Sequence, residues 1–203
     1  MTDDEKFLFD LNGYIIVEGV LSADELAFIN EAIDRHAHLI REHPESLAGG
    51  SPNLKGRRSR GGMGSMMTWD RPWCEPFRKM IAHPKIVPYL NVILGSGFRL
   101  DHGQQLVTMN KGTEGHILHG SSGPGFDPNQ YYIVRDGRMH NGLTVTTWQL
   151  TDVNEGDGGF CVIPGSHKSN CPSPADLRRD MIHRSFIKPL TCKGATSSSS
   201  PKR

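Results

Sequence analysis

The stretch NGLTVTTWQLTDVNEGDGGFCVIPGSHKSN, residues 141–170, decides the fold of this chain. Its first part, Leu143 to Leu150, is rich in β-branched and aromatic residues and predicts a buried strand. Asn154 to Gly159 predicts a tight turn, and Phe160 to Ile163 predicts a returning strand that ends at Pro164-Gly165. We therefore expect a β-hairpin with a polar rim.

The composition is that of an ordinary globular protein with one domain. The chain has 203 residues, of which 36% are hydrophobic and 22% are charged. A net charge of +1 and a pI near 7.8 create no global field that would attract nucleic acid or anionic lipid. We expect a small-molecule substrate, and neither a nucleic acid nor a membrane as partner.

Cysteine usage and the N-terminal residues predict a cytoplasmic protein. The four cysteines are scattered without C-x-x-C spacing and are expected to be reduced thiols. The opening Met-Thr-Asp-Asp-Glu-Lys lacks the basic start and apolar core of a signal peptide, and no stretch reaches ~18 consecutive apolar residues.

The N-terminal half predicts helices. After a short strand at Tyr14 to Val17, Ser22 and Glu25 form a capping box, and a helix is expected to run to about Arg41. Two more helices are expected at Pro72 to Ile81 and Pro84 to Leu94. From Phe98 the pattern becomes extended, so the fold class is α+β, with a helical part over about 1–97 and a β core over about 98–193.

A long loop is expected between the first and second of these helices, at residues 42–69, because glycine, proline and basic residues follow one another without periodicity. Arg57, Arg58 and Arg60 could bind an anionic substrate tail. The alternative is a solvated loop without a ligand.

A second glycine-rich segment, Asn110 to Gln130, carries His116 and His119 just after a strand. A rim at this place in a β-barrel usually presents metal or ligand groups. Because side chains alternate along an extended segment, we expect these two histidines on opposite faces, with at most one pointing inward.

These motifs together resemble the phytanoyl-CoA dioxygenase family of iron(II) and 2-oxoglutarate oxygenases. The matching features are the opening strand at Gly13 to Val17, Asn110-Lys111, the strand with its central Trp148, the turn at Asp157 to Gly159, and Pro164 to Lys168. The resemblance implies N-terminal helices packed on a double-stranded β-helix (jelly-roll, cupin-like) core. It also implies iron(II) and 2-oxoglutarate as cofactors and hydroxylation of a small or lipid-like substrate.

The resemblance further implies that His119 is the first iron ligand and that Trp148 lines the cofactor pocket. Such iron sites need two histidines and one carboxylate. Here the position two after His119 is Ser121, which supplies no anionic oxygen, so Asp127 is the candidate carboxylate.

The second histidine ligand has no match in this chain. The resemblance places His167 at the end of a turn, where it is expected to bond to nearby backbone, and His183-Arg184 has no strand before it. We therefore expect weak or absent turnover. Two alternatives stay open: a non-catalytic member, which is either a binding module or a truncated product without function, and a generic cupin-like metal site made of His116, His119 and His167.

The last residues, 194–203, form a low-complexity tail after a single domain at 1–193 that is expected to lack its last strands. If Ser197 to Ser200 are encoded by TCN codons, the shifted frame reads NTC, which encodes only Phe, Leu, Ile or Val. We hypothesise that this tail is translated out of frame.

Overall fold

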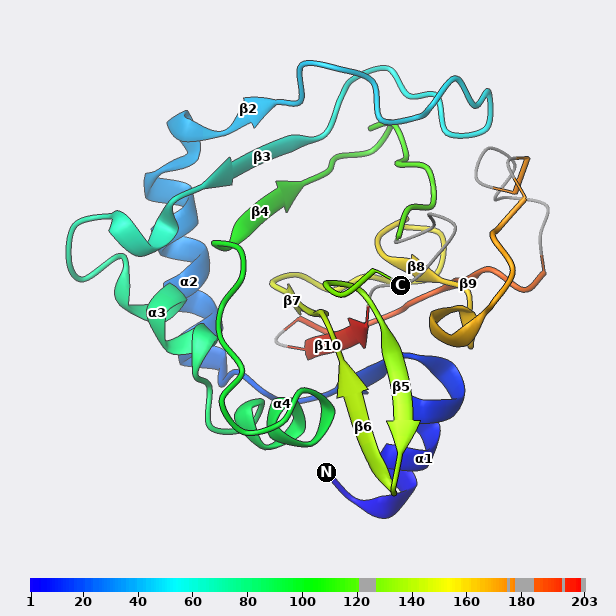
Figure 1. Ribbon diagram of the computed structural model, residues 1–203. Coiled ribbons are helices and arrows are strands. Elements are labelled where there is room, and N and C mark those ends of the chain that lie inside the picture. Colours follow the sequence, from blue (N-terminus) through cyan, green and yellow to red (C-terminus); the bar gives the residue numbers. More distant parts are fainter. Residues whose placement is uncertain (121–126, 175, 178–184, 195, 202–203) are drawn as a thin grey trace.

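The computed structural model describes residues 1–120, 127–174, 176–177 and 185–194, and the backbone of 196–201. The described helices are α1 (Asp3–Asn12), α2 (Ala23–Arg35), α3 (Glu75–Ile81) and α4 (Val87–Ile93), with short 3-10 turns η1 (Ala37–Leu39), η2 (Met66–Thr68) and η3 (Ser166–Lys168). Figure 1 shows them around strands that belong mainly to the second half of the chain.

The described strands form small antiparallel sheets. They are β1 (Ile15–Val17), β2 (Arg41–Glu42), β3 (Gly61–Gly64), β4 (Gln105–Thr108), β5 (Tyr132–Arg135), β6 (Arg138–Asn141), β7 (Thr144–Gln149), β8 (Cys161–Val162), β9 (Lys188–Pro189) and β10 (Thr196–Pro201). Their orders are β1-β10-β7, β2-β3-β4, β5-β6 and β8-β9. The chain is thus a mixed helical and antiparallel β fold, as the α+β prediction required.

Helix α2 begins where the sequence predicts and ends earlier. The Ser22 hydroxyl accepts from the Glu25 backbone N–H, and the Glu25 carboxylate accepts from the Ser22 N–H at 2.9 Å. The helix ends at Arg35 rather than near Arg41, because the His36 ring lies flat on Trp69, with centroids 3.8 Å apart, and the chain turns there into η1.

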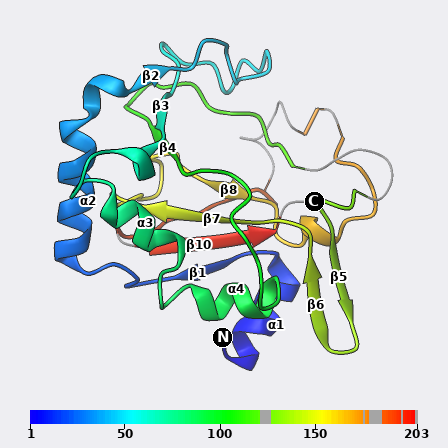
Figure 2. The same cartoon turned by 60° about the vertical axis from the view of Figure 1, so that its left-hand side comes forward.

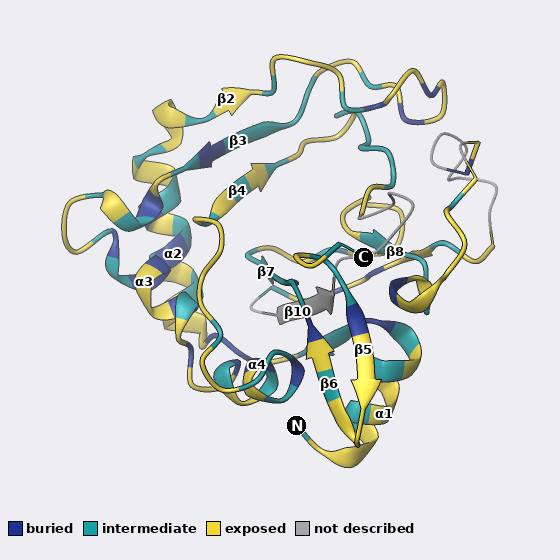
Figure 3. Ribbon diagram, in the orientation of Figure 1, coloured by how far each residue is buried: buried dark blue, intermediate teal, exposed yellow. Residues whose placement is uncertain are grey.

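The main core lies between the helices and the sheets. Buried residues of α2, β3, η2 and α3, with one residue just before α2, form one cluster, against which side chains of β4 and β7 pack. Its buried members are Leu21, Ile29, Ala32, Met63, Met66, Phe77 and Met80. Figure 3 shows buried positions on α2, α3 and β3, whereas the β5–β6 hairpin is largely exposed. The sequence analysis did not predict this hairpin. Its turn is the pair Asp136-Gly137, both with positive φ, as in a type I′ two-residue turn, and Asp-Gly is a common sequence for such turns.

The predicted hairpin at 141–170 is wrong. Both of its strands form, as β7 and β8, but β7 pairs with β10 and β8 pairs with β9. The turn that begins at Asn154 is present, with the Asp157 N–H donating to the Asn154 carbonyl at 3.1 Å. The turn therefore carries the chain from one sheet to another instead of folding it back on the same sheet.

The serine-rich segment after Gly194 is also a strand. β10 runs between β1 and β7 and pairs antiparallel with both, so that Ser198 lies opposite Ile16 on one side and Thr147 on the other (Figure 2). Residues 194–203 therefore include the middle strand of a sheet. Among the described helices, none is long and apolar enough to cross a membrane, and all four cysteines are free thiols.

Candidate metal and substrate site

The His116 and His119 rings lie together. Their centroids are 4.2 Å apart and their planes differ by 29°, a stacked arrangement. The prediction that they lie on opposite faces is wrong, because residues 114–119 have no strand conformation and the alternation of a strand does not apply to them.

One ring nitrogen of His119 is hydrogen-bonded to the backbone. Its Nδ1 lies 3.1 Å from the Ile117 carbonyl, to which it donates. A metal-binding histidine usually donates one ring N–H to a carbonyl in this way, and this hydrogen bond leaves the lone pair of Nε2 available. His119 is exposed, so an ion can reach that nitrogen.

Asp127 is half-buried, and its carboxylate closes a local turn. Oδ1 accepts from the Asn129 backbone N–H at 2.8 Å, and the Asp127 carbonyl accepts from the Gln130 N–H at 3.1 Å. No described contact joins it to His119. Ser121 and His183 lie outside the described residues.

The surroundings of His116 hold its ring in the neutral form. Its pKa falls from 6.5 to about 4, first because the ring is partly buried, then because of the neighbouring His119 and Arg60. The sequence analysis missed Glu114, whose carboxylate accepts from the Ser46 hydroxyl at 2.7 Å and the Leu47 N–H at 2.9 Å. A Glu two residues before a histidine carries no signal of such a contact.

His167 has a structural role, as its position in the motif predicts. It is buried in η3, and its Nε2 donates to the Asp10 carbonyl at 3.1 Å, so the turn bonds to the C-terminal end of α1. The Gly165 N–H donates to the Asn12 carbonyl at 2.8 Å. The Tyr132 ring meets the His167 ring edge-on, with centroids 4.6 Å apart.

Asp10 completes this cluster with its carboxylate. The Tyr132 hydroxyl donates to Oδ1 at 2.6 Å, and Lys168 Nζ lies 3.4 Å from Oδ2. We call the contacts of Asp10, Gly13, Tyr132, His167 and Lys168 the α1 clamp. Sequence analysis missed Asp10 and Tyr132, because nothing in a linear sequence brings together residues more than a hundred positions apart.

The Trp148 indole faces the helices. It packs with the clusters around α2, α3 and α4, and its ring meets His83 edge-on with centroids 5.5 Å apart. Alternation along β7 places Thr147 and Gln149 on the opposite face of the strand. The role of Trp148 beside a cofactor stays a prediction.

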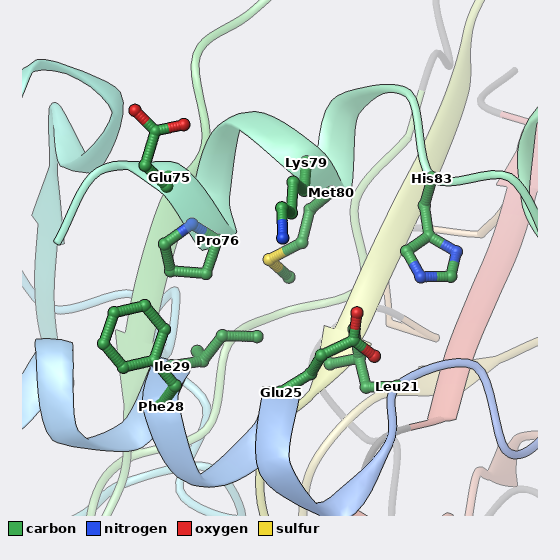
Figure 4. A pocket seen from close by; sticks show the side chains of 9 residues that line it. All are labelled: Leu21, Glu25, Phe28, Ile29, Glu75, Pro76, Lys79, Met80 and His83. Carbon is green, nitrogen blue, oxygen red and sulfur yellow. The ribbon is translucent and has the colours of Figure 1, made fainter. Parts of the chain in front are cut away.

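His83 also borders a small cavity of about 60 Å³ between α2 and α3. Figure 4 shows the side chains of both helices around it, with the Glu25 carboxylate and the His83 ring at one end. Burial lowers the pKa of His83, against the pull of Glu25. Most of the lining is apolar, and the cavity is too small for an organic cofactor.

Within the described ranges, no group of three or more His, Cys, Asp or Glu side chains could hold a metal ion. The hypothetical set of His116, His119 and His167 is therefore not formed, since His167 belongs to the α1 clamp. The described residues supply one oriented histidine and no complete set of ligands for iron.

Several solved structures have a fold similar to that of this chain. HygX from Streptomyces hygroscopicus, solved with nickel and 2-oxoglutarate bound, matches with a TM-score of 0.76 at 14% identity over 100% of this chain and 78% of that one. SnoN, a non-heme α-ketoglutarate-dependent epimerase from nogalamycin biosynthesis, gives 0.62 at 19% identity over 99% and 73%. EctD from S. alaskensis gives 0.54 at 19% identity over 100% and 69%. The fold is that of the iron- and 2-oxoglutarate-dependent oxygenases.

A comparison of the sequence with family models identifies the family of this chain. The model of the phytanoyl-CoA dioxygenase (PhyH) family matches residues 9–198, nearly the whole chain. This chain therefore belongs to the phytanoyl-CoA dioxygenase family, as the motifs predict. A comparison with curated protein sequences finds no match.

Proposed function

We propose that this chain is an oxygenase domain of the iron(II) and 2-oxoglutarate type whose ancestral activity is the hydroxylation of a small or lipid-like substrate. His119 and Asp127 would hold the iron, and Trp148 would support the cofactor pocket from the helix side of β7. The observation that carries the proposal is the hydrogen bond from His119 to the Ile117 carbonyl, because it presents Nε2 as a ligand. The family match and the cofactors bound to HygX and SnoN support the choice of iron and 2-oxoglutarate.

The residues that the structure describes fit iron only in part, so we expect weak or absent turnover. A facial site needs two histidines and a carboxylate. His119 and Asp127 would fill two of the three positions. Without the third ligand, iron is expected to bind loosely and to leave easily.

A second candidate is a non-catalytic binding module with the same fold. It is favoured by the absence, among the described side chains, of a set of three metal ligands. In that case the rim would bind a small molecule without oxidising it.

Iron titration and succinate release test the two candidates together. The chain and two variants, His119→Ala and the control His140→Ala, are titrated with iron(II) without oxygen and then assayed for succinate from 2-oxoglutarate. His140 is an exposed histidine of β6, remote in sequence from the rim. We expect weak iron binding that is lost in His119→Ala and kept in His140→Ala, with little succinate.

Each other result changes the conclusion. Robust iron-dependent succinate release that survives His119→Ala would show that the ligands are misassigned. No iron binding by the unaltered chain would support the non-catalytic module.

We further infer that the sheets form part of a jelly-roll core, and that residues 194–203 are read out of frame. The position of β10 supports this inference. A strand paired on both sides normally carries β-branched or apolar residues and excludes proline, whereas β10 reads Thr-Ser-Ser-Ser-Ser-Pro. Reading the gene across codons 190 to 203 tests the inference, and AGY codons for the serines would exclude it.

A further inference from the structure

The loop at residues 43–60 is bonded along the segment that bears the two rim histidines. Figure 1 shows this loop at the upper edge of the molecule, next to the segment that follows β4. The Gly115 N–H donates to the Leu54 carbonyl at 2.8 Å, and the Glu114 N–H donates to the Arg58 carbonyl at 3.0 Å. These backbone bonds hold the second half of the loop. The first half is held by a side chain of the histidine segment.

The Glu114 carboxylate holds the first half of the loop. Its Oε2 accepts from the Ser46 hydroxyl at 2.7 Å, and its Oε1 accepts from the Leu47 N–H at 2.9 Å. The Ser46 hydroxyl oxygen is fixed in turn, because it accepts from the Ala48 N–H at 3.3 Å. The carboxylate therefore sets the position of the backbone at residues 46–48 relative to the histidine segment.

The backbone of Leu47 continues this series of bonds to His119. The Leu47 carbonyl accepts from the Ile117 N–H at 3.1 Å, and the Ile117 carbonyl accepts from His119 Nδ1 at 3.1 Å. Because a carbonyl can only accept, the last bond fixes the proton on Nδ1 and leaves the lone pair on Nε2. Three successive hydrogen bonds thus connect the Glu114 carboxylate to the His119 ring.

Packing contacts hold the same residues. Gly49 has φ +59°, and a Cβ added there would lie 2.7 Å from Cγ2 of Ile117, so the loop backbone lies directly against this side chain. The His116 ring lies on one face of the His119 ring, with centroids 4.2 Å apart. His119 is therefore held at its Nδ1 edge and on one ring face, although the residue is exposed. An exposed side chain keeps one orientation only where such contacts offset its loss of rotamer freedom.

We propose that Glu114 is a positioning residue for His119. By holding residues 46–48 against Ile117, it fixes the carbonyl that orients the His119 ring. The proposal rests on the proposed function, since it names the group that prepares the ligand of that same site. A ligand that is already oriented loses less freedom when a metal binds, so the metal binds more tightly. Glu114 acts through two hydrogen bonds, which an uncharged side chain of the same length can also make.

NMR of the metal-free chain, labelled with nitrogen-15 at histidine, tests the positioning without any metal. The ring nitrogen shifts of His119 in mild alkali report which nitrogen bears the proton. We expect an Nδ1–H ring in the unaltered chain and in Glu114→Gln, whose amide keeps both bonds, and an average of both tautomers in Glu114→Ala. The control Glu45→Ala removes the same charge from an exposed position of the same loop and should leave these shifts unchanged. An Nδ1–H ring in Glu114→Ala, or an averaged ring in the unaltered chain, would overturn the proposal.

Gly49→Ala tests the same connection with the carboxylate intact. The added methyl group would displace Ile117, so the His119 ring should again exchange between both tautomers. Gly50→Ala is the matched control, because Gly50 has φ +76° and nothing within 4 Å of the added carbon. It shares the backbone strain and should keep the Nδ1–H ring. Thermal unfolding of each variant checks that the domain stays folded. Unchanged His119 shifts in a folded Gly49→Ala variant would show that Ile117 does not set the ring, which would also overturn the proposal.

Titration with nickel(II) measures what the positioning does for metal affinity. The affinity should fall about 10-fold in Glu114→Ala, the lower end of the effects of groups that orient a metal ligand. It should change less than ~2-fold in Glu114→Gln and Glu45→Ala, since a distant exposed charge is screened. Equal losses in Glu114→Gln and Glu114→Ala would mean that charge acts instead of the two bonds, and would overturn the proposal. No nickel binding by the unaltered chain would contradict the proposed function alone, and the NMR shifts would then decide the positioning of His119.

Discussion

The α1 clamp and the His119 rim both carry a histidine that the family motifs single out, and their surroundings differ. In the clamp, His167 is buried, bonded to the Asp10 carbonyl and enclosed by Tyr132. At the rim, His119 is exposed and bonded on one nitrogen only. A histidine whose ring is buried against backbone and an aromatic ring stabilises the fold, whereas one with a nitrogen facing solvent can bind a ligand.

Replacing each histidine by alanine tests this difference most strongly. His167→Ala removes a buried ring and its hydrogen bond, so the free energy of unfolding should fall by about 3 kcal/mol. His119→Ala should change it by less than about 0.5 kcal/mol, because the side chain is exposed. Urea unfolding of both variants measures the two effects. Equal losses would show that the rim histidine is also part of the core.

Gly13 tests the packing of the clamp. It ends α1 at φ +78°, and a methyl group there would meet the His167 ring. Gly13→Ala should lower the unfolding free energy by about 2 kcal/mol, partly from the left-handed backbone and partly from this collision. Gly19→Ala is the control, because Gly19 has φ +61° and nothing within 4 Å of the added carbon.

The collision can be isolated in the double variant Gly13→Ala/His167→Ala. With the ring removed, Gly13→Ala should cost no more than Gly19→Ala, which gives a coupling energy of about 1 kcal/mol. If the loss in the double variant equals the sum of the losses in the two single variants, the ring does not lie against Gly13.

Local signals in the sequence correctly predicted most of the helices and some of the strands. The capping box at Ser22 and Glu25 set the start of α2, and β-branched residues marked β7. The pairing partner of β7 could not be predicted. β7 pairs with β10, some fifty residues later in the chain, and no local pattern encodes that partner. The strand at Gly61–Gly64 was read as loop, since three glycines have low strand propensity and only pairing with β4 makes them extended.

In the candidate site, too, features that depend on local sequence could be predicted and long-range contacts could not. The motif identified His119 as a ligand candidate and His167 as a turn residue, since both assignments depend on position relative to a neighbouring element. The stacking of His116 on His119 and the two bonds of Glu114 depend on how the loop at 43–60 lies in space. The bonds of Glu114 join segments about seventy residues apart, and the stacking of the two histidines follows from a backbone without strand conformation, so the sequence alone could not predict either.

Tyr132 offers a smaller test of the clamp. Tyr132→Phe removes the hydroxyl that donates to Asp10 and should lower the unfolding free energy by about 1 kcal/mol. Burial, with the Asp10 bond, raises the pKa of Tyr132. The stabilisation is therefore present below the unfolded value of about 10 and lost as the pH rises through the folded value. Unfolding curves of the unaltered chain and of Tyr132→Phe, measured at pH 7 and in alkali, test this. The difference in unfolding free energy between the two proteins should be smaller in alkali, and an equal difference at both pH values would contradict the prediction.

The smallest expected effect is an acid dependence at the rim. The pKa of His116 is lowered from 6.5 to about 4, first by burial and then by His119 and Arg60, so the folded chain binds fewer protons than the unfolded chain between these values. The resulting stabilisation is present above pH 6.5 and is lost as the pH falls toward 4. Because the ring is only partly buried, solvent screens these interactions, and the stabilisation should amount to less than about 1 kcal/mol.

His116→Gln isolates this contribution, since glutamine does not titrate. The variant should lose less stability than the unaltered chain between pH 7 and pH 4.5, and the difference in urea midpoints measures it. His140→Gln, on the exposed β6 strand, serves as the control and should follow the unaltered chain. Parallel pH curves for all three proteins would mean that His116 titrates like an exposed histidine, and the rim would then be as open to solvent at His116 as it is at His119.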